Sequence, residues 1–71
     1  MELLIFRTDI KTKKKVKIIK PFFNKASKII DWSIDTEDID NILRIEGVDG
    51  IKESDIIHLT KACGFYCKAL D

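Results

Sequence analysis

The feature that most constrains the fold of this chain is the order in which two kinds of apolar pattern follow each other. Four short stretches have the composition and patterns of β-strands and cover residues 2–8, 30–34, 42–46 and 65–70. Two further segments repeat apolar residues at helical spacing, one over residues 12–26 and one that ends at Gly64. This order predicts a β-α-β-β-α-β unit, in which two helices cover one face of a four-stranded antiparallel sheet.

The first helical segment begins with a capping signal. Thr12 can accept a hydrogen bond at the N-terminus of a helix, and an apolar stripe with lysines around it follows. The stripe consists of Val16, Ile19, Phe23 and Ala26. Pro21 lies inside this segment and removes a backbone hydrogen bond at a cost of about 3 kcal/mol, so we expect a bend or a loosened helix end there.

The second half of the chain reads as a hairpin followed by a helix and a last strand. Ile30, Trp32 and Ile34 alternate with polar residues, and the polar turn 36–41 leads into the next strand. Acidic residues in its first turn and a final glycine mark the second helix. Its predicted buried face consists of Ile56, Leu59, Thr60 and Cys63, and Gly64 follows as the C′ residue.

The composition limits the chain to one domain. At 71 residues, with 45% hydrophobic and 35% charged residues, it has room for a single core. We therefore expect one ferredoxin-like α+β sandwich over residues 1–71.

No apolar run approaches the roughly 18 residues that span a bilayer, and the start is unlike a signal peptide, so we expect a cytoplasmic protein without membrane contact. The two closely spaced cysteines, Cys63 and Cys67, do not form the dense disulfide framework of a small secreted domain, so we expect both to be reduced thiols.

The net charge of +1 conceals an uneven distribution. Residues 1–28 contain nine of the 13 basic residues and two acids, whereas residues 29–71 contain four basic residues and ten acids. This split favours a protein partner, or a domain whose halves attract each other, over a nucleic acid. The predicted topology gathers the lysine run 11–15, the acidic hairpin 35–40 and the segment 63–66 at one end of the sheet.

The whole chain resembles the heavy-metal-associated domains of copper chaperones and of metal-pumping ATPases. The residues that carry the resemblance are Leu3-Leu4-Ile5-Phe6, Val16, Ile19, Trp32, Ile34, Leu43, Ile45 and the helix end Ala62-Cys63-Gly64-Phe65. The resemblance implies the same sandwich fold and the shape of a metallochaperone.

The metal-binding loop of that family is absent from this sequence. Family members hold a soft monovalent ion between two thiolates of a Met-x-Cys-x-x-Cys loop after the first strand. Counted back from Val16, the matching positions are about Asp9 and Thr12, which offer hard oxygen donors. We therefore expect no family-type metal site and no cofactor. The alternative is a soft-metal-binding chaperone with Cys63 and Cys67 as relocated ligands, although both fall in phase with apolar core residues.

No pattern in the sequence predicts catalysis. His58, the single histidine, lies off the apolar stripe and forms no triad pattern, and we find no nucleophile motif or phosphate-binding glycine loop. The acidic hairpin lacks the central glycine and final glutamate of an EF-hand, which favours a solvated turn over a cation site. Strand 42–46 lacks the aromatic motif of RNA-binding domains, which disfavours nucleic acid.

One face of the sheet should remain uncovered by the helices. We assign Leu3, Ile5, Leu43 and Ile45 to the side of the helices. Leu4, Phe6 and Ile42 then lie on the open face as an exposed apolar patch. We predict a non-enzymatic interaction or regulatory domain that binds a protein partner, or a second copy, through this patch. Further partner-binding candidates at the charged loop end are Lys13, Lys14 and Tyr66.

Overall fold

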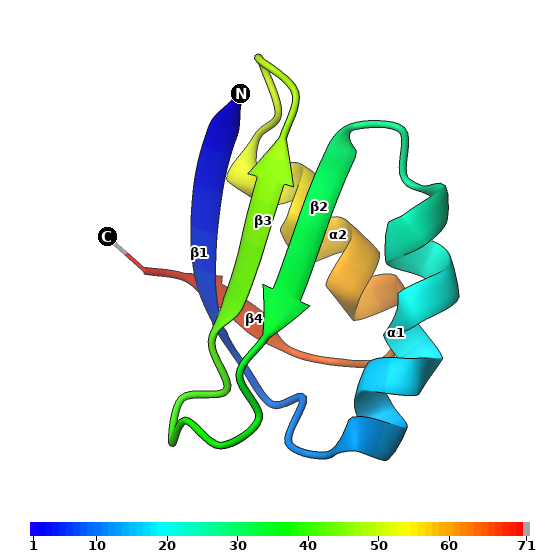
Figure 1. Cartoon of the computed structure of the whole chain (residues 1–71), viewed down its shortest axis with the longest axis vertical. Coiled ribbons are helices and arrows are strands. Elements are labelled where there is room, and N and C mark those ends of the chain that lie inside the picture. The colour runs from blue at the N-terminus through cyan, green and yellow to red at the C-terminus, as the bar shows by residue number, and fades with distance from the viewer. Residues whose placement is uncertain (71) are drawn as a thin grey trace.

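The computed structural model describes residues 1–70 and confirms the predicted order of elements (Figure 1). Its strands are β1 (Glu2–Thr8), β2 (Ile29–Ile34), β3 (Leu43–Gly47) and β4 (Cys67–Ala69), and its helices are α1 (Lys13–Lys25) and α2 (Glu53–Ala62). The strands pair antiparallel in the order β2-β3-β1-β4, and both helices lie behind one face of the sheet. The predicted ferredoxin-like sandwich is confirmed. Within the described residues, neither helix is long and apolar enough to cross a membrane.

Helix α1 begins where the capping signal predicts. The Thr12 hydroxyl accepts a hydrogen bond from the backbone N–H of Lys15 at 3.1 Å. Ile19 and Phe23 are fully buried, and Val16 packs half-buried against the same core. The apolar stripe of the first helix therefore faces the sheet, as its spacing indicates.

Pro21 does not end α1, because the helix continues to Lys25. The proline removes the donor that would reach the carbonyl of Lys17, but both residues are exposed, so water can replace this donor. The C-terminus of the helix is capped by a hydrogen bond, because the backbone N–H of Ala26 donates to the carbonyl of Phe23 at 3.2 Å. Of the two expectations for Pro21, the loosened helix end is therefore wrong, and the bend stays a prediction.

Local hydrogen bonds and backbone geometry cap both ends of helix α2. The Asp55 carboxylate accepts a hydrogen bond from the backbone N–H of Lys52 at 2.9 Å. The buried Thr60 hydroxyl donates to the carbonyl of buried Ile56 at 2.8 Å. Gly64 follows the helix with φ of +89°, a left-handed conformation that glycine adopts without strain. The predicted C′ role of Gly64 is confirmed.

The core lies between the sheet and the two helices. The fully buried apolar side chains are Phe6, Ile10, Ile19, Phe23, Leu43 and Ile45. Phe23 meets Trp32 of β2 edge to face, with ring centroids 5.2 Å apart and an interplanar angle of 81°. The Trp32 indole N–H also donates to the Asn24 side chain at 2.9 Å. These contacts fix α1 against the β2 edge of the sheet.

The structure corrects the predicted faces of β1. Phe6 is fully buried and Leu4 packs against the core, whereas Leu3 is 58% exposed. Residues directly opposite each other on paired strands share a face. Leu4 pairs with Ile45 and Phe6 pairs with Leu43, so all four point toward the helices. The assignment of Leu43 and Ile45 is confirmed, whereas that of β1 is wrong by the equivalent of a one-residue shift.

Three smaller differences concern the ends of the strands. A bulge between Ile29 and Asp31 leaves Ile30 57% exposed, so it does not continue the alternation that buries Trp32. Ile42 lies just before β3 and is half-buried. The last strand is limited to three residues, because Phe65 and Tyr66 belong to the loop that precedes it.

Candidate functional site

Three connections meet at the lower end of the sheet in Figure 1, namely the β1–α1 loop, the β2–β3 hairpin and the α2–β4 loop. The Thr8 backbone N–H donates to the carbonyl of Asp40 at 3.1 Å, and the Thr8 hydroxyl donates to the carbonyl of Asn41 at 2.7 Å. Asp9 and Tyr66 exchange two hydrogen bonds: the Asp9 N–H donates to the Tyr66 carbonyl at 3.3 Å, and the Tyr66 N–H donates to the Asp9 carboxylate at 2.8 Å. We call these five residues the loop clasp. The predicted gathering of the three loops is confirmed.

In the described part of the chain, no lysine near this end forms an ion pair with the acidic hairpin. The Arg7 side chain, rather than a lysine, lies 3.2 Å from the Asp40 carboxylate. Within residues 1–70, no lysine of α1 lies within 4 Å of a carboxylate. Lys13 and Lys14 are exposed in the first turn of α1, and Tyr66 is 55% exposed. These three candidates are accessible, and their role in binding stays a prediction.

The two cysteines lie where the apolar pattern places them. Cys63 is half-buried after α2, and Cys67 is 8% exposed on β4. Burial raises the pKa of the Cys63 thiol. Burial is also the main cause of the raised pKa of the Cys67 thiol, where the Asp9 charge adds to the effect and a hydrogen bond with Thr60 opposes it. A raised pKa keeps a thiol protonated, whereas soft metals bind the thiolate. This environment supports the interpretation of both cysteines as core side chains.

The positions that match the family cysteines have structural contacts in this chain. Thr12 caps α1, and Asp9 belongs to the loop clasp. His58 is exposed on α2. Over residues 1–70, no three His, Cys, Asp or Glu side chains gather closely enough to hold a metal ion.

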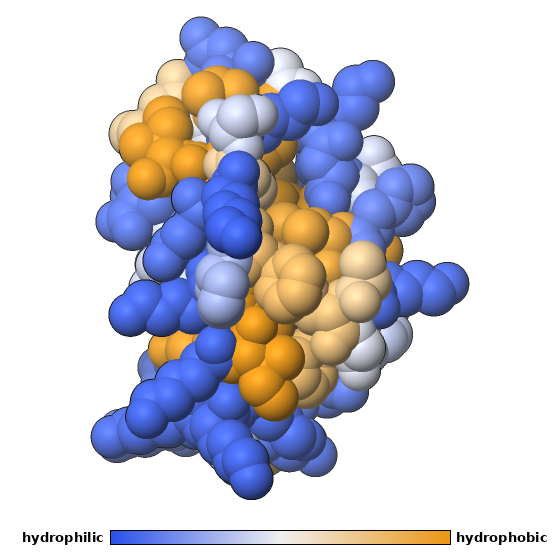
Figure 2. Space-filling view, turned by 90° about the vertical axis from the view of Figure 1, so that its right-hand side faces the viewer, coloured by the Kyte–Doolittle hydropathy of each residue, from blue (hydrophilic) through white to orange (hydrophobic). Residues whose placement is uncertain are grey.

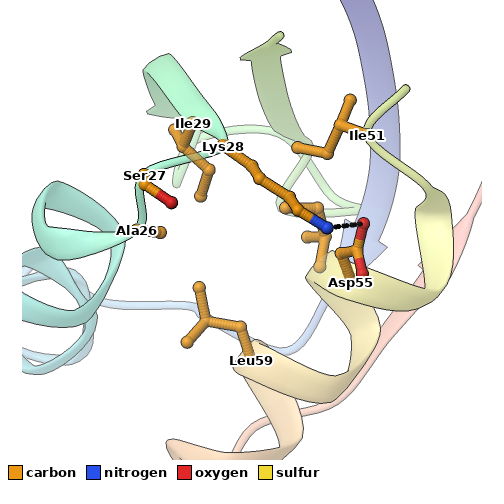
Figure 3. A pocket seen from close by; sticks show the side chains of 8 residues that line it. Ala26, Ser27, Lys28, Ile29, Ile51, Asp55 and Leu59 are labelled. Atoms are coloured by element: carbon orange, nitrogen blue, oxygen red, sulfur yellow. Dashed lines mark ion pairs between the residues drawn. The ribbon is translucent and has the colours of Figure 1, made fainter. Parts of the chain in front are cut away.

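A groove of about 270 Å³ lies between the end of α1 and the first half of α2 (Figure 3). Its apolar lining comes from Ala26, Ile29, Ile51, Ile56 and Leu59. The Lys28 ammonium lies 3.5 Å from the Asp55 carboxylate at the groove. The backbone hydrogen bond from Lys52 is the main cause of the lowered pKa of Asp55, and the Lys28 charge adds to it. The ion pair is therefore formed at neutral pH, although its exposure to water limits its strength.

The outer side of α1 carries an apolar strip that the sequence pattern did not single out. Figure 2 views the molecule from the side of α1 and shows apolar surface bounded by hydrophilic side chains. Ile18 and Phe22 are one helical turn apart and are 48% and 49% exposed. This strip is small, and single exposed apolar residues are common on folded proteins.

The open face of the sheet carries both apolar and charged side chains. We define the sheet patch as Leu3, Ile5, Arg7, Asp31, Ser33, Arg44, Glu46, Lys68 and Leu70. Leu3 is 58% and Leu70 is 36% exposed, and Ile5 is half-buried. The backbone N–H of Leu70 donates to the carbonyl of Ile5 at 2.9 Å, which brings β1 and the end of β4 together. A shallow hollow of about 150 Å³ lies at the acidic side of this patch.

The sheet patch replaces the apolar patch predicted from the sequence. Leu4 and Phe6 cannot contact a partner from the open face, because they point into the core. Arg7 was the signal that could have identified the correct face. Arg7 lies two positions after Ile5 and four after Leu3, so the three side chains share one face of β1. A charged side chain is expected to face water, which assigns this face to the open side of the sheet.

Comparison with known proteins shows similarity at the level of the fold. No model of a known protein family matches the sequence, and no curated protein matches it. The yeast copper transporter domain Ccc2a, solved in apo and Cu(I)-loaded states, superimposes with a TM-score of 0.82 at 14% identity, covering 100% of this chain and 97% of that chain. A chain of the Atx1–Cu(I)–Ccc2a complex gives a TM-score of 0.83 at 14% identity and the same coverage.

A third solved chain comes from work on crosstalk between Cu(I) and Zn(II) homeostasis. It superimposes with a TM-score of 0.83 at 6% identity and covers 99% of this chain and 100% of its own length. At these identities the similarity defines the fold. The chain has the fold of the heavy-metal-associated copper-binding domains, as its sequence pattern indicated.

Proposed function

We propose that this chain is a small, non-enzymatic protein-interaction or regulatory domain with the shape of a metallochaperone. The observation that carries the proposal is the sheet patch, in which exposed Leu3 and Leu70 flank Ile5 between acidic and basic side chains. Neighbouring exposed apolar side chains flanked by charged ones are typical of protein-binding surfaces. We place its action in the cytoplasm.

Two further observations support a protein partner. Ccc2a, which shares this fold, has been solved in a complex with Atx1. The raised pKa values of the Cys63 and Cys67 thiols disfavour the thiolates that the alternative soft-metal chaperone requires. A protein partner in a structural neighbour and the protonated state of the Cys63 and Cys67 thiols together support recognition of a protein.

The experiment compares three forms of the immobilised domain: the wild type, Leu3→Glu and Phe22→Glu. Both variants add one negative charge at a partly exposed apolar position, but Leu3 lies on the sheet patch and Phe22 on α1. Each immobilised form is exposed to a protein mixture that includes free copies of the domain itself. Quantitative mass spectrometry then measures which proteins each form retains. We expect at least one protein to be retained by the wild type and by Phe22→Glu, and lost with Leu3→Glu. Equal retention by all three forms contradicts the proposal.

A metal titration tests the alternative function directly. Native mass spectrometry of the reduced protein with one equivalent of Cu(I) measures the stoichiometry, and a competing chelator measures retention. We expect the wild type and Cys63→Ser to lose copper equally. Tight retention of one copper ion by the wild type, lost in Cys63→Ser, establishes the cysteine pair as the functional site instead.

A further inference from the structure

We propose that the partner of the sheet patch is a second copy of this chain, packed face to face with its strands crossed at about 90°. This inference rests on the proposed function, because it names the occupant of the same surface. It depends on the strand register, which fixes where each charge of the sheet patch lies relative to the others.

The register arranges the sheet patch in three rows across the strands. The first row contains Asp31, Glu46 and Leu3; the second contains Ser33, Arg44, Ile5 and Leu70; the third contains Arg7 and Lys68. The acidic residues thus occupy the corner on β2 and β3, and the two basic residues of the third row occupy the opposite corner on β1 and β4. The charges of the open face are separated along its diagonal.

The sheet patch is also nearly square. Neighbouring strands are about 4.8 Å apart, and residues two positions apart along a strand are about 6.7 Å apart, so four strands and three rows each extend over about 14 Å. A two-fold axis along the other diagonal, which joins the two remaining corners and separates the acidic corner from the basic one, therefore exchanges rows with strands. This operation places the rows of one copy over the strands of the other.

In this crossed arrangement each acidic corner meets a basic corner. Asp31 lies opposite Lys68 of the other copy, and Glu46 lies beside the same lysine. Leu3 lies opposite Leu70 of the other copy, so the apolar residues also meet. Because the interface is two-fold symmetric, each of these contacts occurs twice. Within residues 1–70, Lys68 makes no ion pair with a carboxylate.

The other symmetric ways to stack two such faces are less favourable. An axis along the diagonal that joins the acidic and basic corners places acidic corners on each other and basic corners on each other. An axis parallel to β1 places Glu46 over Leu3 and Arg44 over Ile5. An axis across the strands places Arg7 over Leu3 and Arg44 over its own copy. The crossed arrangement brings both acids to basic residues, and charge complementarity therefore selects it.

The small size of the patch sets the expected strength. A square of about 14 Å on each side covers roughly 200 Å² before the side chains extend beyond it, far less than the about 800 Å² per partner of a standard interface. We therefore expect a weak, reversible dimer that is visible at high protein concentration and weakens with salt.

The test is sedimentation of the protein at low ionic strength, at concentrations up to about 1 mM. The variants are Asp31→Lys, Lys68→Asp and the double variant Asp31→Lys/Lys68→Asp. We expect each single variant to raise the dissociation constant about tenfold, because like charges then face each other twice. The double variant, and an equimolar mixture of the two single variants, should restore association, because opposite charges meet again in both cases.

Two controls separate this geometry from general charge effects. Glu53→Lys makes a similar charge change on exposed α2 and should leave the dissociation constant unchanged. Arg44 is the charged residue closest to the axis and approaches its own copy, so Arg44→Gln should associate at least as tightly as the wild type. Circular dichroism confirms that each variant remains folded.

A wild type that stays monomeric up to about 1 mM overturns the inference. Loss of association in a single variant that the mixture fails to restore overturns the crossed geometry. Neither result affects the proposed function, which depends on whether Leu3→Glu removes a retained protein. If a different protein is retained and lost in that way while the domain stays monomeric, the proposed function stands and the second copy is excluded.

Discussion

The two faces of the sheet differ in how they use similar residues. On the face toward the helices, Phe6 is fully buried among apolar side chains, whereas on the open face Leu3, three positions earlier in the same strand, is 58% exposed beside charged residues. The first face holds the fold together, and the second is accessible to other molecules. The comparison shows that an apolar residue in a strand defines neither a core nor a binding surface until the register is known.

The largest effect should come from truncating the buried face. Phe6→Ala removes a fully buried aromatic side chain, and we expect it to lower the free energy of unfolding by about 3–5 kcal/mol. Leu3→Ala should change it by less than about 0.5 kcal/mol, because this side chain is largely in water. Chemical denaturation measures both. Similar losses for the two variants would contradict the assignment of the faces.

A second, smaller effect should come from a buried polar residue on the same face. Thr8 is 5% exposed; its hydroxyl donates to the Asn41 carbonyl and accepts the Ile10 N–H at 3.2 Å. Thr8→Val keeps the shape but leaves both backbone groups without this partner, at an expected cost of about 2 kcal/mol. Ser33→Ala on the open face is the control and should be nearly neutral. If Thr8→Val leaves the free energy of unfolding unchanged, the two hydrogen bonds of the Thr8 hydroxyl do not stabilise this end of the sheet.

The smallest effect concerns pH and lies in the helix layer. The pKa of Asp55 is lowered in the folded protein, mainly by the Lys52 N–H, so its contribution to stability is present above the unfolded pKa and is lost as pH falls through the folded value. We expect Asp55→Asn to lower the Tm at pH 7 and to differ less from the wild type below about pH 4. Glu53→Gln removes a charge in the same turn without the capping contact and serves as control. A Tm difference that is independent of pH would refute this role of the carboxylate.

The sequence predicted the fold well because its elements carry local signals. Thr12 and Gly64 mark helix ends through hydrogen bonds and a backbone conformation that depend on nearby residues, and both are confirmed. The phase of β1 has no such local signal, because residues 3–6 are all apolar and satisfy either face. It is decided by pairing with Leu43 and Ile45, which are more than 35 positions away in the chain.

The candidate site was harder to predict than the fold for the same reason. The residues of the sheet patch come from all four strands, and no spacing along the chain brings Asp31 and Lys68 onto one surface. Ile30 shows a second limit, because a bulge removes it from the alternation that a simple strand pattern assumes. The sequence therefore indicated that an open face exists but assigned Leu4 and Phe6 to it wrongly.

The loop clasp has a consequence for protein engineering. Replacing Asp9 and Thr12 by cysteines would place two thiols three positions apart in the chain, but it would also remove the carboxylate that accepts the Tyr66 N–H and the hydroxyl that caps α1. Ligand chemistry and local structure thus compete for the same two positions. A designed metal site at this end would need a new cap and a new acceptor for Tyr66 in addition to the two thiols.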